Sequence, residues 1–84
     1  MGYRVELEPR AARGFGNLPS RTRRQVADRL KALRVQPRPA ACRKLKALPG
    51  FRLSVGDYRI LYTVNDQNST VTVWRVGHRR DVYR

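Results

Sequence analysis

Three consecutive strand-like runs joined by short turns constrain the fold of this sequence more than any other feature. The runs are residues 51–55, 58–64 and 70–76, and they are rich in β-branched, aromatic and other apolar side chains. The two connections between them carry Gly, Asp, Asn and Ser, which favour turns. Short turns join neighbouring strands in antiparallel order. The second half of the chain therefore predicts an antiparallel meander, with residues 58–64 in the centre because both faces of that run carry bulky side chains.

The first half of the chain predicts one strand and two helices. Residues 3–8 alternate apolar and polar side chains, as a half-buried strand does. Residues 10–18 place apolar side chains on one side of a short helix, and residues 20–36 carry an apolar stripe at helical spacing. Prolines at positions 37 and 39 end the second helix. We expect residues 38–50 to be a basic connector.

The predicted order of elements is β-α-α-β-β-β, which is an α+β fold. Two helices with one apolar face each pack as a helical hairpin on one face of an antiparallel sheet, and the other face is left to solvent or a partner. The chain has 84 residues, which favours one domain across residues 1–84.

The net charge of the chain favours a polyanionic partner. Nineteen Lys and Arg stand against six Asp and Glu, giving a formal net charge of +13. Nucleic acid is the favoured partner, with a membrane surface or a compositional bias toward Arg as alternatives. No apolar run approaches the ~20 residues of a membrane helix, and the N-terminal residues lack the apolar segment of a signal peptide. We expect a cytoplasmic protein without a membrane partner.

The cysteine and histidine content argues against a disulfide and a metal centre. Cys42 is the single cysteine and His78 the single histidine, so neither an intrachain disulfide nor a set of closely spaced zinc ligands can be assembled. We expect no metal and no cofactor.

Several cations lie on the predicted sheet or just after it, and they suit one reaction class. When RNA is cleaved by its own 2′-hydroxyl, the phosphorane carries extra negative charge that fixed guanidinium groups stabilise. His78 and Tyr83 are the natural candidates for proton transfer. On residue types alone, however, two other interpretations are favoured over cleavage: that the arginines are simply solvated, or that the protein only binds RNA or an acidic partner. The cations are Arg52, Arg59, Arg75, Arg79 and Arg80.

Three motifs resemble the RelE/ParE toxin superfamily. Residues 56–62, GDYRILY, are similar to the superfamily's GDYRxxY hairpin, and residues 76–83, VGHRRDVY, to the tail of its RelE branch. Upstream, residues 44–53, KLKALPGFRL, resemble the lead-in to that hairpin. The resemblance extends over essentially the whole chain, and its tail motif favours the RelE branch.

The resemblance implies the toxin of a type II toxin–antitoxin system. Toxins of the RelE type are metal-independent endoribonucleases that enter the ribosomal A site and cut the mRNA codon there through attack by the 2′-hydroxyl. By position, Arg59 matches the arginine that contacts the scissile phosphate, and Arg79 matches the one that stabilises the transition state. Tyr83 matches the tyrosine that stacks on or helps to activate the nucleotide.

Further site residues follow from the same comparison. Arg52 falls at the first of two basic strand positions that bind the backbone and act in proton transfer. The second position falls on Ser54, which moves the role of general base to another group, with His78 as the candidate. We expect the remaining cations of the motifs to bind substrate, namely Lys44, Lys46 and Arg80.

The resemblance also implies partners. We expect an acidic antitoxin that wraps the toxin, the ribosome with its mRNA, and operator DNA reached only through the antitoxin. Two alternatives stay open: a ParE-like toxin that inhibits DNA gyrase, and a basic RNA- or ribosome-binding module without catalytic activity.

Overall fold

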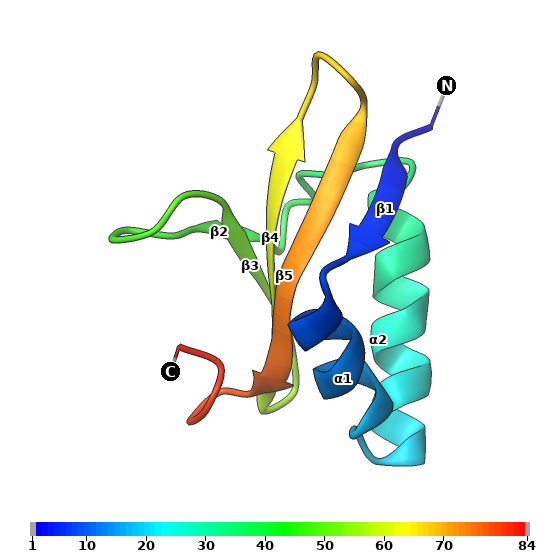
Figure 1. The fold of residues 1–84 in the computed structure, drawn as a ribbon, viewed down its shortest axis with the longest axis vertical. Helices are drawn as coiled ribbons and strands as arrows, with labels where there is room; N and C mark the ends of the chain where they lie inside the picture. The colour runs from blue at the N-terminus through cyan, green and yellow to red at the C-terminus, as the bar shows by residue number, and fades with distance from the viewer. Residues whose placement is uncertain (1, 84) are drawn as a thin grey trace.

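The computed structural model describes residues 2–83, in which two helices cover one face of a five-stranded sheet (Figure 1). This arrangement confirms the predicted α+β fold. The elements are β1 (Arg4–Leu7), α1 (Pro9–Gly16), α2 (Ser20–Leu33), β2 (Arg43–Lys44), β3 (Phe51–Val55), β4 (Tyr58–Asn65) and β5 (Thr70–His78).

The strand order is β1-β5-β4-β3-β2, and it confirms the meander but corrects the direction of the first strand. β3, β4 and β5 are antiparallel neighbours. β1 lies at the edge and runs parallel to β5, with Arg4 opposite Thr70 and Leu7 opposite Val73. The sheet is therefore mixed, and not wholly antiparallel as predicted. Both sides of β4 are taken by β3 and β5, so the strand that leads into α1 pairs along the outer side of β5.

The predicted connector contains a short fifth strand. Arg43 and Lys44 form β2, which pairs antiparallel with Arg52 and Phe51 of β3. A strand of two residues has no alternation to reveal it, so the sequence pattern missed it. β5 also extends past its predicted end at residue 76, because Gly77 and His78 still pair with β4.

The core lies between the helices and one face of the sheet. Val26 and Leu33 of α2 are fully buried there, together with Ile60 and Tyr62 of β4. α1 packs on β5 so closely that a Cβ on Gly14 would collide with the carbonyl oxygen of Val76. Glycine is thus required in the middle of α1 by the distance between helix and sheet.

The second helix ends at Leu33, three residues before its predicted end. Gln36 precedes Pro37, and a residue before proline is sterically pushed away from helical geometry. Pro37 is buried, and its carbonyl accepts a hydrogen bond of 2.9 Å from the hydroxyl of Tyr62. This contact fixes the connector that leaves α2 against the central strand.

Among residues 2–83, no helix has the length and apolar character to cross a membrane.

Candidate functional site

The face of the sheet turned away from the helices, here called the open face, owes its shape to a bulge in β5. Val71, Val73 and Val76 are fully buried in the core on the helix side. Regular alternation would place residue 75 there, but the register with β4 shifts between Leu61 and Tyr62. Trp74 and Arg75 therefore both point away from the core. The open face carries Arg52, Arg59, Leu61, Thr63, Thr72, Trp74 and Arg75.

The end of the chain folds back over part of this face. Arg75 Nη2 donates a hydrogen bond of 3.0 Å to the carbonyl oxygen of Asp81. The next residue, Val82, is only 1 % exposed, and Leu61 of the open face is fully buried. Both residues lie outside the helix-side core. In Figure 1 the segment after β5 lies on the side of the sheet opposite the helices. The segment 79–83, here called the tail, thus covers the lower part of the open face.

Arg75 is an unusual residue for this position, because its guanidinium is partly withdrawn from water. Burial lowers its pKa, and the neighbouring charge of Arg10 lowers it further. Its Nε atom is buried and has no hydrogen-bond partner among residues 2–83. The hydrogen bond to the tail is the compensation that the structure shows for this burial.

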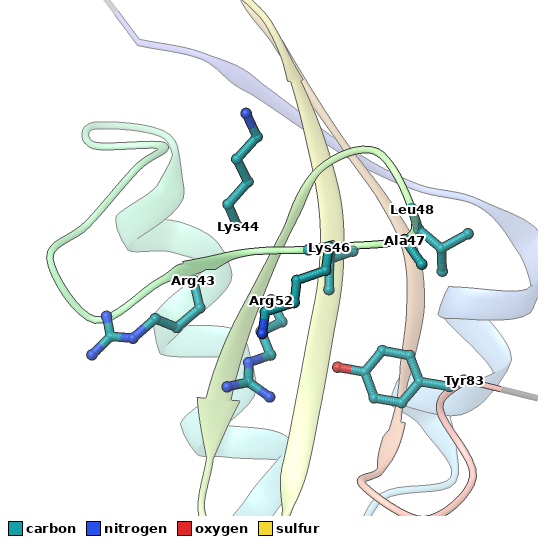
Figure 2. Close-up of a pocket in the computed structure, with 8 residues that line it drawn as sticks. Arg43, Lys44, Lys46, Ala47, Leu48, Arg52 and Tyr83 are labelled. Atoms are coloured by element: carbon teal, nitrogen blue, oxygen red, sulfur yellow. The ribbon is translucent and has the colours of Figure 1, made fainter.

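Beside the tail lies a cleft of about 440 Å³, here called the basic cleft. Its walls are the lead-in to β3, one residue of β3 and the tail tyrosine. Figure 2 shows the hydroxyl of Tyr83 turned toward Arg52 and Lys46, whereas Lys44 extends away from them. Tyr83 is 50 % exposed, which leaves its ring accessible to a ligand. The lining residues are Arg43, Lys44, Leu45, Lys46, Ala47, Leu48, Arg52 and Tyr83.

Two further predicted residues gather at the turn between β3 and β4. Arg59 Nη1 donates to the carbonyl oxygens of Gly56 and Tyr58, at 2.9 and 3.0 Å. The backbone N–H of Arg79 donates to the carbonyl oxygen of Asp57 at 2.8 Å, and its Nε lies 3.8 Å from the Asp57 carboxylate. This loose ion pair is solvated at both ends, with side chains 52 % and 68 % exposed.

His78 lies apart from the basic cleft. It is the register partner of Tyr58, and their rings meet edge to face with centroids 5.4 Å apart. Tyr58 packs against the helix-side core, and directly opposed residues share a face of the sheet. Nδ1 of His78 accepts a hydrogen bond of 3.2 Å from the backbone N–H of Arg80.

The structure thus brings together one group of the predicted site residues and separates the rest. Lys46, Arg52 and Tyr83 lie together in the basic cleft, which Lys44 also lines, while Arg59 and Arg79 each contact the turn between β3 and β4. Arg80 is exposed on the tail.

One contributor was absent from the predicted site, and a second was named only among the cations of the sheet. Arg43 lies in the cleft wall, beside the predicted Lys44. Arg75 holds the tail, and its sequence signal is the pair Trp74-Arg75 between two core valines, which breaks strand alternation. Within residues 2–83, no three His, Cys, Asp or Glu side chains gather as a metal site would require.

A family model described as "ParE toxin of type II toxin-antitoxin system, parDE" matches residues 5–83, nearly the whole chain. Among curated proteins, "Toxin RelG" of Mycobacterium tuberculosis is 34% identical over 86 residues, covering 100% of this chain and 99% of that protein.

Solved structures give the same classification. The toxin–antitoxin complex RelBE2 of M. tuberculosis contains a chain with a TM-score of 0.82 and 32% identity, and the match covers 94% of this chain and 100% of that one. A free E. coli toxin RelE with two arginines replaced by alanine gives a TM-score of 0.78 and 30% identity, over 93% and 84% of the two chains. The mixed sheet, the open basic face and these likenesses agree, and the chain belongs to the RelE/ParE superfamily as a RelE-type toxin of a type II toxin–antitoxin system.

Proposed function

We propose that the protein is an endoribonuclease that cleaves mRNA in the ribosomal A site and so inhibits translation. The basic cleft supports this most, because Lys46, Arg52 and Tyr83 meet there on the face that no helix covers. Cationic side chains beside an accessible aromatic ring fit the phosphate and the base of a single-stranded nucleotide.

In the proposed reaction, the 2′-oxygen of one nucleotide forms a bond to the adjacent phosphorus. The bond between that phosphorus and the 5′-oxygen of the next nucleotide breaks. One proton passes from the 2′-hydroxyl to a general base, and another reaches the departing 5′-oxygen, leaving a 2′,3′-cyclic phosphate and a 5′-hydroxyl. Arg52 and Lys46 stabilise the extra charge of the phosphorane. Their fixed charges let the proposed step proceed without a metal ion or cofactor.

We assign proton transfer to the Tyr83 hydroxyl in the basic cleft and not to His78. The hydroxyl of Tyr83 faces the two cations in Figure 2, whereas His78 stands against Tyr58 on the other face of the sheet. Tyr83 is also placed to stack on the base beside the scissile phosphate.

Arg79 and Arg59 would act from the turn beside the cleft. The ion pair between Arg79 and Asp57 is long and solvated, so a phosphate can compete for the guanidinium. Arg59 is held in place by two carbonyl oxygens through one of its nitrogens, and its guanidinium has further N–H donors for a phosphate.

We propose an acidic antitoxin as the inhibitory partner. The similar solved structures include toxin–antitoxin complexes from M. tuberculosis and from E. coli. An acidic segment would be attracted to a chain with a net charge of +13 and would compete with RNA for the basic cleft.

The test is cleavage of mRNA on translating ribosomes, mapped by primer extension. The wild-type chain should cut within the A-site codon, and Arg79→Ala should cut about 10²–10³ times more slowly, which is the usual cost of losing a transition-state donor. Arg24→Ala, which removes the same charge from the exposed surface of α2, is the matched control and should cut at the wild-type rate. Equal rates for the wild-type and Arg79→Ala chains would show that the assigned role is wrong.

A gyrase inhibitor is the second candidate, because the matching family model carries the ParE description. A chain that leaves mRNA intact and blocks DNA supercoiling by gyrase would establish this candidate. A chain that binds ribosomes and does neither would be a passive binding module.

A further inference from the structure

A second hollow of about 370 Å³ adjoins the basic cleft on the open face and is here called the tryptophan slot. Thr63 and Thr72, which are register partners on β4 and β5, form its floor. Leu48 lines both the slot and the basic cleft, so a ligand can extend from one into the other. The lining residues are Glu8, Leu48, Pro49, Thr63, Thr72 and Trp74.

The bulge in β5 explains why a tryptophan faces this slot. The interval of three between the core residues Val73 and Val76 turns both intervening side chains to the open face. Trp74 is only partly buried, and no aromatic ring of residues 2–83 stacks on it. A large indole with an accessible surface beside a cationic cleft is a stacking platform for a nucleobase.

Glu8 is the charged residue among those that line the slot. It occupies the N-cap position of α1, yet its side chain makes no capping hydrogen bond, while its backbone N–H donates to the carbonyl oxygen of Val73 at 2.9 Å. The backbone of Glu8 is thus fixed against β5, and its carboxylate remains available to a ligand. An ionised carboxylate only accepts hydrogen bonds, and its two oxygens match a pair of adjacent N–H donors.

We propose that the tryptophan slot binds a nucleobase of the RNA whose phosphate lies in the basic cleft, and that guanine binds best. Guanine presents two adjacent N–H donors on its Watson–Crick edge, which pair with the Glu8 carboxylate while the ring stacks on Trp74. Uracil lacks that pair of donors. An acidic peptide would be repelled by Glu8, and a purely apolar one would leave its carboxylate unpaired. The inference rests on the proposed function in taking RNA as the substrate.

Trp74 is the single tryptophan of the chain, so its fluorescence reports on the slot directly. The experiment titrates the full chain with GMP, AMP, CMP and UMP, and with inorganic phosphate alone. GMP should quench the fluorescence saturably and at the lowest concentration. UMP should bind about tenfold or more weakly, the discrimination expected from a two-point hydrogen bond to a base edge. Inorganic phosphate should leave the fluorescence unchanged.

Two variants separate recognition of the base from general effects of charge. Glu8→Gln should weaken the binding of GMP about tenfold and leave that of UMP nearly unchanged. Glu6→Gln is the matched control, because it removes the same charge from an exposed position of β1 outside the slot, and it should preserve the preference for GMP. Calorimetry of Trp74→Leu, with folding checked by circular dichroism, should show GMP binding about tenfold or more weaker through the loss of stacking.

The proposal is overturned if none of the nucleotides quenches the fluorescence saturably. It is also overturned if Glu8→Gln and Glu6→Gln have equal effects on GMP binding. Quenching by an antitoxin peptide with none by nucleotides would identify the slot as a protein-docking surface and would also overturn it. Failure of this binding proposal can be told apart from failure of the proposed mRNA cleavage. Failure to cleave mRNA together with selective binding of GMP retains the base site, whereas cleavage without such binding rejects the slot alone.

Discussion

Arg75 shows how one side chain of the sheet controls a segment several residues away. Its guanidinium lies between the bulge of β5 and the carbonyl oxygen of Asp81, to which it donates at 3.0 Å. The amide groups of Asp81 and Val82 both donate to the carbonyl oxygen of His78, so the tail is a tight turn. Tyr83 follows this turn directly, and its position at the basic cleft depends on where the turn is held.

Replacing Arg75 should therefore release the tail without unfolding the domain. In Arg75→Leu the stem of the side chain still covers the sheet, but a hydrogen bond from a charged donor, typically about 1.5–3 kcal/mol, is lost. The amides of Asp81 and Val82 should exchange with solvent roughly tenfold to hundredfold faster by NMR, and cleavage should slow because Tyr83 is no longer fixed. Arg24→Leu on α2 is the control, and unchanged exchange at both tail amides would show that the tether is unimportant.

The segment between α2 and β2 has no regular structure, and contacts to Tyr62 and Asp66 hold it in place. The hydroxyl of Tyr62 holds the carbonyl of Pro37. Arg38 binds Asp66 through two N–H···O hydrogen bonds of 3.2 and 2.9 Å, and Tyr3 donates to the same carboxylate at 2.7 Å. Asp66 thus joins the start of β1, the connector and the turn between β4 and β5.

Asp66→Asn should lower the melting temperature at neutral pH but not in acid. Hydrogen bonds from Arg38, and then from Tyr3, lower the pKa of Asp66. Because its pKa is lower in the folded than in the unfolded chain, the carboxylate stabilises the fold above about pH 4, and this contribution is lost as pH falls through the folded pKa. The two melting temperatures, measured by circular dichroism from pH 7 downward, should converge below about pH 4.

Asp28→Asn, at an exposed position of α2, is the control for the Asp66 experiment and should melt close to the wild-type temperature. If the melting temperatures of Asp66→Asn and the wild-type chain still differ by the same amount in acid, the destabilisation does not come from loss of the carboxylate.

The elements that the sequence predicted correctly are those with a local pattern. The meander and both helices follow from residue spacing. Lys46, Arg52 and Tyr83, which lie together at the basic cleft, were named through the motifs that resemble the RelE/ParE superfamily, and their roles stay predictions. The parallel pairing of β1 with β5 has no local signal, because it joins residues far apart in the chain. His78 was the candidate base because it is the single imidazole and Ser54 stands at a usually basic position, but its register opposite Tyr58 directs it to the other face.

At the scale of the whole molecule, charge repulsion opposes the compact fold. The principal extents are 32 × 27 × 25 Å, so at 0.01 M ionic strength, where the Debye length is about 30 Å, the charges repel one another across the entire structure. At about 0.15 M the Debye length is only about 8 Å and most of this repulsion is screened. With a net charge of +13, charge repulsion destabilises the isolated chain most in dilute buffer.

Salt should consequently stabilise the isolated chain. Between about 0.01 and 0.15 M sodium chloride, the melting temperature should rise on the order of 5 °C, corresponding to about 1 kcal/mol in a domain of this size. Sodium acetate at the same ionic strength serves as the control, and an equal rise identifies screening as the cause. A melting temperature that stays constant or falls with salt would contradict net repulsion.

The parallel pairing of β1 with β5 also has a kinetic consequence. The β3–β4–β5 meander forms from contacts close in sequence, whereas β1 must close a loop that spans most of the chain before Arg4 meets Thr70. We therefore expect β1 to be the last strand to join the sheet. Until it does, the outer side of β5 is an unpaired edge, which is a template for pairing with another chain. We expect the protein to be most prone to aggregation in the interval before β1 docks.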